Sequence, residues 1–322
     1  MTAEVNPGVG TIQPVVIGGR EEQEIRRRRK PIVPYLLVGA PITVLLLGMG
    51  YPFIRQIITS FQGFGMAQQF GAPAEWVGFD NYIAIFSDPR FISVLWRSLL
   101  FCVITSALIV VIGLLIALLM RSVHGWVKIV MQVTLLLAWA TPVIASATVF
   151  RWLFNDRTGV VNYLLVQLGF DGMANHAWFS RPFTFFVVAV LLIVWMGVPF
   201  VAMSLYAGLT QVPEEILEAA RIDGASSRQI LWRIIMPLVK PVLAIVLLLQ
   251  FIWNLRVFAQ IRLLQDGGAP ISDTNLLGNF IFELGMGRQN FGQAAAVSII
   301  VLLLTILISA PYVRSLMKED TL

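Results

Sequence analysis

Long apolar stretches alternate with shorter polar ones along the chain after residue 31. Six of these stretches reach the roughly 20 mostly apolar residues that a helix needs to cross the hydrocarbon core of a bilayer. They are residues Ile32–Ile54, Val94–Met120, Val127–Phe150, Pro182–Leu205, Val239–Ile261 and Ala294–Arg314. Backbone groups in lipid must be paired within the segment, and the sequence lacks the alternating pattern of barrel strands. We therefore predict an all-α, polytopic membrane protein with six transmembrane helices.

The composition agrees with this interpretation. The chain has 322 residues, of which 57% are hydrophobic and 13% are charged, and its mean hydropathy is +0.80. Soluble domains carry about twice that share of charged residues. The composition therefore excludes an ordinary soluble domain.

The basic residues predict an orientation. Six spans place both termini on one side of the membrane, and most of the 23 Lys and Arg residues would lie on that side. The cluster Arg26–Lys30 directly precedes the first span, which favours a cytoplasmic topology anchor over a nucleic-acid site. We expect residues 1–31 to be a disordered cytoplasmic tail, residues 32–318 the transmembrane domain and residues 319–322 a short tail.

Motifs for enzyme chemistry are missing from the sequence. It has no phosphate-binding loop of the form G-x-x-x-x-G-K-[ST], and no zinc, redox or serine-hydrolase motif. Cys102 is the only cysteine, and His124 and His176 fall in loops on opposite sides of the expected membrane. We therefore predict no catalytic residue, no metal site and no cofactor for this chain.

One polar segment, Leu209–Pro241, interrupts the apolar pattern on the cytoplasmic side. Pro213 suits the first turn of a helix, and acidic residues follow it at the positive end of the helix dipole. We predict a helix over Glu214–Ile222 that ends near Gly224, because glycine readily takes the left-handed conformation that ends helices.

A second short helix should follow this turn. Ser226 or Ser227 can cap its first turn, and we expect it to run to about Met236, where Pro237 would break it. Taken residue by residue, the segment is also compatible with an ordinary solvated loop.

A spaced pattern makes the segment more specific. It reads Glu-Ala-Ala, three residues, Gly, nine residues, then Ile, one residue and Met-Pro, and its residues are Glu218, Ala219, Ala220, Gly224, Ile234, Met236 and Pro237. This pattern resembles the EAA loop of ABC importer permeases, which ends in Ile-x-Leu-Pro, so Met236 is a departure. In that family the loop forms a coupling helix that fits a cleft on the ATP-binding subunit. The resemblance implies that the residues at this interface are Glu218, Ala219, Ala220, Asp223 and Gly224.

Further stretches resemble carbohydrate-uptake permeases, in particular the MalF-like member of a permease pair. They are Trp195-x-Gly197-x-Pro199-Phe200, Trp152–Asn155 with Gly159 and Asn162, Gly78–Tyr82, Leu263–Gly268, and Asn290–Gly292. The resemblance implies a type I ABC importer permease fold in a bacterial or archaeal cytoplasmic membrane, working by alternating access. It also implies partners: a MalG-like second permease, a dimer of ATP-binding subunits that hold ATP and Mg, and an external solute-binding protein that delivers a carbohydrate.

Polar groups inside the fifth predicted span are candidates for the substrate pathway. Gln250 and Asn254 lie four residues apart and so share one helical face, next to Trp253. They are equally compatible with hydrogen bonds that hold helices together. Arg256 either lines the pathway or reaches to the outer interface, and we slightly favour the second role. The resemblance adds the candidates Trp195, Met196, Gly197 and Phe200.

Two other functions stay open at this point. A permease of the same fold for a glycerol phosphodiester or a sugar phosphate would favour a cationic site, and Arg256 would suit it. An ion-coupled secondary carrier would need coupling carboxylates or paired repeats, and no Asp or Glu lies within the six predicted spans.

Overall fold

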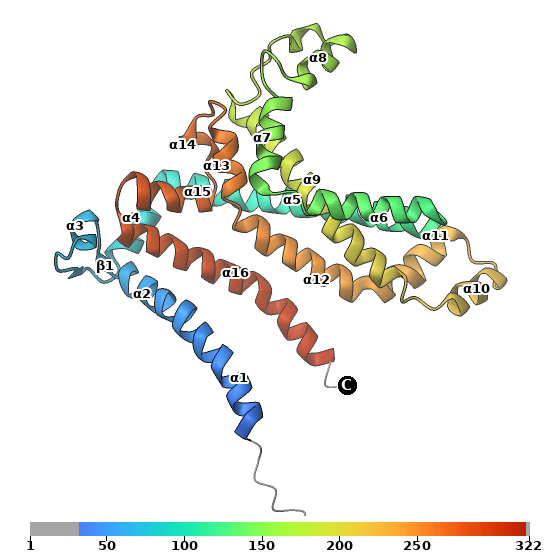
Figure 1. The fold of residues 1–322 in the computed structure, drawn as a ribbon, viewed down its shortest axis with the longest axis horizontal. Coiled ribbons are helices and arrows are strands. Elements are labelled where there is room, and N and C mark those ends of the chain that lie inside the picture. Colours follow the sequence, from blue (N-terminus) through green and yellow to red (C-terminus); the bar gives the residue numbers. More distant parts are fainter. Residues whose placement is uncertain (1–31, 320–322) are drawn as a thin grey trace, which may run out of the picture. The chain divides into compact units, whose positions relative to one another are not determined.

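The computed structural model describes residues 32–319. The predicted tail at residues 1–31 and nearly all of the tail at residues 319–322 lie outside the described residues. Contacts divide the chain into two compact units, one ending at Arg55 and one beginning at Gln56. Most described residues are helical (Figure 1).

The N-terminal unit consists of helix. α1 (Ile32–Leu45) continues through the π-helical turn η2 (Leu46–Gly50) into α2 (Tyr51–Ser60), whose last residues belong to the second unit. The stretch Leu36–Ser60 is long and apolar enough to cross a membrane. The first span therefore extends about six residues beyond the predicted end.

The second unit holds the longer helices. These are α5 (Pro89–Ser122), α6 (Trp126–Trp139), α7 (Val143–Leu153), α9 (Pro182–Leu209), α12 (Met236–Leu255) and α16 (Phe291–Glu319). The short helices are α3 (Met66–Gln69), α4 (Asp80–Ser87), α8 (Val160–Gln167), α10 (Glu214–Ile222), α11 (Ser227–Gln229), α13 (Ala259–Gln265), α14 (Ile271–Thr274) and α15 (Leu277–Phe282). The helical turns are η3 (Asp171–Met173), η4 (Ile230–Ile235) and η5 (Glu283–Gly287). Strands β1 (Gln62–Gly63) and β2 (Glu75–Trp76) pair antiparallel, with Gln62 opposite Trp76.

The third predicted span, Val127–Phe150, consists of two helices joined at a sharp bend. α6 and α7 meet at an angle of 95°. The reason is Pro142, which precedes α7 in an extended conformation with ψ 141° and forces the residue before it out of helical geometry. Five described helices are long and apolar enough to cross a membrane, and the bent pair makes a sixth candidate.

The fifth predicted span, Val239–Ile261, is wrong at both ends. The apolar helix begins at Ser227, passes through η4 into α12 and ends at Leu255, so Pro237 does not break it. Pro237 lies in the first turn of α12, directly after the π-helical turn, where a missing N–H is tolerated.

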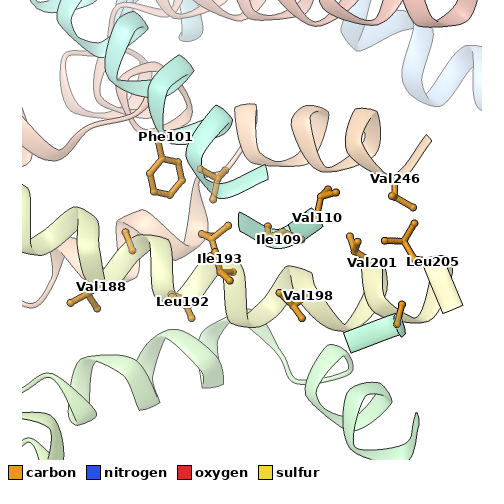
Figure 2. Close-up of a cluster of buried hydrophobic side chains, with 14 of the residues drawn as sticks. Phe101, Ile109, Val110, Val188, Leu192, Ile193, Val198, Val201, Leu205 and Val246 are labelled. Carbon is orange, nitrogen blue, oxygen red and sulfur yellow. The ribbon is translucent and has the colours of Figure 1, made fainter. Parts of the chain in front are cut away.

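The main core lies where α5, α9 and α12 pack together (Figure 2). Its buried side chains include Phe101, Ile109 and Val110 of α5, Val188, Leu192, Ile193, Val198, Val201 and Leu205 of α9, and Val246 of α12. Lipid tails are as apolar as these side chains, so close packing has to hold the helices together. Gly113 permits it, because a Cβ there would lie 2.7 Å from Cγ1 of Val201 and 3.2 Å from the backbone nitrogen of Ala202.

Asn81 joins the β-ribbon to its surroundings. Its Nδ2 donates to the carbonyl oxygens of Ser60 and Gln62, at 3.0 Å each. The backbone nitrogen of Gly292 donates to the carbonyl of Phe64 at 3.0 Å, and a Cβ on Gly292 would collide with the Gln62 carbonyl. The two family-like stretches around Asn81 and Gly292 therefore build one corner of the fold.

Candidate functional site

A cavity of about 430 Å³ lies between α9, α12 and the turn after α12, and we name it the inner cavity. Seven of the eight substrate-pathway candidates line it: Met196, Gly197, Phe200, Gln250, Trp253, Asn254 and Arg256. Its other lining residues are Trp139, Ile193, Val257, Phe258, Ala259 and Gln260. Small-molecule sites typically measure roughly 300–1,000 Å³ and combine apolar walls with a few polar groups. The inner cavity has this character.

Gln250 and Gly197 meet at the wall of the inner cavity. Gln250 is 2% exposed, and a Cβ on Gly197 would lie 3.2 Å from its Oε1 and 2.7 Å from Cδ1 of Ile109. Within residues 32–319, Nε2 of Gln250 has no hydrogen-bond partner. A buried donor without a partner costs about 1–3 kcal/mol, so this amide is well placed to donate to a polar solute.

Asn254 makes a different contact. Its Nδ2 donates to the hydroxyl oxygen of Ser106 in α5 at 3.0 Å, and the residue is 6% exposed. This bond ties α12 to α5, which is the helix-pairing role that the sequence left open. Ser106 was not a sequence candidate, because an isolated serine in an apolar helix carries no distinguishing pattern.

Three aromatic rings form a continuous wall of the inner cavity. The rings of Phe200 and Trp253 meet edge to face, with centroids 5.1 Å apart. Trp139 stacks on Phe200 at 6.4 Å with an interplanar angle of 26°. The sequence missed Trp139, because only the break between α6 and α7 brings this residue to the end of its helix beside the cavity.

Trp195 is the one pathway candidate that does not line the inner cavity. Two helical residues advance by about 200° around the axis, so its side chain leaves α9 almost opposite to the side on which Gly197 lines the cavity. Its ring contacts Phe150 instead, with centroids 6.0 Å apart. The family-like pattern covers both faces of this segment, and Trp195 lies on the face that does not line the inner cavity.

Arg256 lies at the C-terminal end of α12 and lines the inner cavity. Its side chain is exposed. This position is compatible with either role considered for Arg256, in the pathway or at the outer interface.

The polar segment Leu209–Pro241 contains α10, which has the predicted bounds. Gly224 ends the turn after this helix with φ +78°, and the backbone nitrogen of Ala225 donates to the carbonyl of Ala220 at 2.9 Å. No atom lies within 4 Å of a Cβ built on Gly224. Glycine is therefore required there by backbone conformation and not by packing. Ser226 caps the next helix together with Gln229, as the sequence predicted.

The two faces of α10 differ. Leu217 and Ala220 are 2% and 9% exposed and pack within this chain. Ala220 therefore offers less surface to a partner protein than the family pattern implied. The exposed face includes Glu218, Ala219, Asp223 and Gly224, with Ile222 at 85% exposure. The sequence analysis did not single out Ile222, although an isoleucine on the polar side of a helix is an unusual placement.

Comparison with known families decides the class. The family model described as "Binding-protein-dependent transport system inner membrane component" matches residues 109–315, which is more than half of the chain. This chain belongs to that family. It is therefore the membrane component, or permease, of a transport system. Its described residues include several helices that are long and apolar enough to cross a membrane.

Curated relatives match the permease over most of its length. It is 38% identical to the diacetylchitobiose uptake system permease protein DasB of Streptomyces coelicolor, over 91% of this chain and 89% of the relative. It is 33% identical to the sulfoquinovosyl glycerol transport system permease protein SmoG of Agrobacterium fabrum, over 88% and 91% of the two chains. The arabinooligosaccharides transport system permease protein AraP of Bacillus subtilis is 27% identical, over 93% and 94%.

A solved structure confirms the fold. A chain of a bacterial alginate ABC transporter, crystallised with an alginate pentasaccharide-bound periplasmic protein, superposes with a TM-score of 0.75 at 21% identity. The match covers 90% of the permease and 94% of that chain. The permease therefore has the ABC importer permease fold that its sequence predicted.

Proposed function

We propose that this permease forms half of the pathway of an ATP-driven importer for a sugar or oligosaccharide. The observation that carries the proposal is the inner cavity, which is lined by the aromatic rings of Trp139, Phe200 and Trp253 and by the buried residue Gln250. A sugar ring presents apolar C–H faces and hydroxyl groups, so it needs both kinds of contact. The solutes named for the relatives DasB and AraP, diacetylchitobiose and arabinooligosaccharides, support this class.

The same proposal assigns coupling to α10. Glu218, Ala219, Ala220, Asp223 and Gly224 would meet a cleft on an ATP-binding subunit, with the exposed Ile222 adding an apolar contact. An exposed apolar side chain on a soluble segment is typical of an interaction surface. ATP and Mg would bind to a dimer of these partner subunits.

The remaining partners follow from the architecture of such importers. A MalG-like second permease would complete the pathway, and an external solute-binding protein would deliver the sugar. Closure of the ATPase dimer would drive alternating access of a bundle with two stable arrangements. Both termini and α10 would then lie in the cytoplasm of a bacterial or archaeal cell.

A second candidate solute is an anionic glycoside. Arg256 lines the inner cavity and is its only charged lining residue within the described chain, which favours a negative group on the solute. The relative SmoG is named for sulfoquinovosyl glycerol. Substitution of Arg256, described in the Discussion, separates the two solute classes.

Gentle purification of the permease from its native membrane tests the proposal. We expect an ATP-binding subunit, a second permease and a solute-binding protein to copurify, and the ligand of the binding protein to be a sugar. Proteoliposomes holding this assembly should take up that sugar only with ATP inside. A permease that purifies alone and moves solute without ATP would overturn the proposal.

A further inference from the structure

A second cavity of about 460 Å³ lies on the outer part of the second unit, and we name it the outer cavity. Its walls come from the end of α7, the turn before α8, the residues that precede α9 and the turn after α13. Its lining includes three charged residues, two tryptophans and one amide: Arg151, Asp156, Asp266, Trp152, Trp178 and Asn155.

We propose that the outer cavity is a second carbohydrate site, at which the imported sugar binds before it reaches the inner cavity. The inference rests on the proposed function, because it takes the solute to be a sugar. It adds a site that the family-like patterns in the sequence do not assign to substrate.

The aromatic walls of the outer cavity are held in place. Trp178 donates its indole N–H to Oδ1 of Asn162 at 2.6 Å, and its ring meets Phe154 edge to face at 5.2 Å. Asn162 in turn donates to the carbonyls of Asp156 and His176, at 3.1 and 3.0 Å. The buried amide of Asn162 thus fixes the indole of Trp178. The second tryptophan, Trp152, is 57% exposed, so its ring is free to stack on the face of a sugar.

Several polar groups at the outer cavity keep hydrogen-bonding capacity for a ligand. Oδ1 of Asn155 accepts three bonds from Arg157 and Thr158, which leaves the amide donors of Asn155 without an acceptor among the described residues. Nη1 of Arg151 contacts the carbonyl of Leu263 at the long distance of 3.4 Å, and its other donors are not engaged within residues 32–319. Arginine and amide donors pair well with adjacent hydroxyl groups.

The charges around the outer cavity favour a neutral ligand. Arg151 lines the cavity together with two carboxylates, Asp156 and Asp266, and the Asp266 carboxylate lies 4.0 Å from Arg262. A strongly anionic solute would meet these carboxylates, and the arginines would repel a cation. A neutral sugar accepts bonds from the arginine and donates its hydroxyl protons to the carboxylates.

Two helices connect the outer cavity to the inner one. α13 begins at Ala259 beside the inner cavity and ends just before Asp266 at the outer one. α7 lies against α13, as Figure 1 shows, and extends from the break after Trp139 to Trp152. At about 1.5 Å per residue, these helices span roughly 10 and 16 Å, so the two sites are one short helix apart.

The test uses the assembled importer, with its binding protein, in proteoliposomes. Tritiated N,N′-diacetylchitobiose and arabinotriose are the probes. We expect Trp152→Ala to raise KM about 3- to 10-fold with kcat retained, and Trp152→Phe to restore most of the affinity. Trp126→Ala is the matched control, because Trp126 is 74% exposed at the opposite end of the α6–α7 pair.

A photoreactive diazirine derivative of the transported probe separates a sugar site from a structural role. Cross-linking should label the peptide that carries Trp152 in the wild type, and should still do so in Gln250→Leu, where labelling at the inner cavity falls. If the wild type takes up neither probe, the proposed sugar class fails and this inference fails with it. Uptake with unchanged kinetics in Trp152→Ala, or labelling confined to the inner cavity, overturns the outer site alone.

Discussion

Gly197 of α9 and Gln250 of α12 approach so closely that a Cβ on the glycine would lie 3.2 Å from Oε1 of the glutamine. The contact brings a buried amide, 2% exposed, to the wall of the inner cavity. A glycine in the middle of a membrane helix thus sets the position of the polar group that we assign to the solute.

Replacing Gly197 with valine should therefore displace Gln250. We expect a loss of stability of about 1–3 kcal/mol from overpacking, and a fall in uptake of at least tenfold in assembled complexes. The measurements are the thermal unfolding midpoint and ATP-dependent uptake in the same preparation. Gly172→Val is the control, because no atom lies within 4 Å of a Cβ built there. Wild-type uptake by Gly197→Val would remove Gln250 from the site.

Gln250→Leu and Asn254→Leu should separate transport from assembly. Gln250→Leu removes the unpartnered donor, so uptake should fall while the complex stays intact. Asn254→Leu breaks the 3.0 Å bond to Ser106, so the unfolding midpoint should fall. A double-mutant cycle with Ser106→Ala should give a coupling energy of about 0.5–1 kcal/mol. A zero coupling energy would contradict the helix-pairing role of Asn254. Dissociation of the Gln250→Leu complex would contradict the solute-binding role of Gln250.

Gly224→Val should uncouple ATP hydrolysis from uptake. Gly224 has φ +78°, and a β-branched residue there costs roughly 1–3 kcal/mol of backbone strain, which would reshape the end of α10. We expect the protein to stay in the membrane and uptake to be abolished. Uptake and the ATPase activity that the binding protein stimulates are measured in the same preparation.

Gly169→Val is the matched control for this prediction. Gly169 has φ +92° with open space around it, and it follows the end of α8 as Gly224 follows the end of α10. It carries the same kind of strain without the proposed contact to an ATPase. Full uptake by Gly224→Val, or equal loss in both variants, would argue against the coupling assignment.

Arg256→Gln should distinguish the two solute classes. A charge-assisted hydrogen bond contributes about 1.5–3 kcal/mol, so an anionic glycoside should lose at least tenfold in apparent affinity. For the neutral sugar that we propose, KM should change by less than about threefold. Competition by sulfoquinovosyl glycerol against a neutral probe measures the difference. A tenfold loss for the neutral probe would place Arg256 on an uncharged part of the solute.

Local chemistry allowed the sequence to predict much of this protein. The length of the apolar runs predicted the membrane class, because every backbone group in lipid has to be paired inside a helix. Pro213, Gly224 and Ser226 predicted the bounds of α10 and the turn after it, because caps and left-handed turns depend on neighbouring residues. The spaced Glu-Ala-Ala pattern, centred on the same helix, led to the family that the comparison confirmed.

Features that depend on contacts between residues far apart in the sequence were decided by the tertiary structure. An apolar run does not reveal that Pro142 bends it by 95° and thereby brings Trp139 to Phe200. The spacing of Gln250 and Asn254 placed both on one helical face but did not show that they make different contacts. The partner of Asn254 is Ser106, which lies 148 residues earlier in the chain. The sequence by itself determined the class, the number of apolar stretches and the turn at Gly224, since each depends on residues close in sequence. Only the packing of α5, α9 and α12 decided which polar groups face a cavity, because that depends on which helices meet.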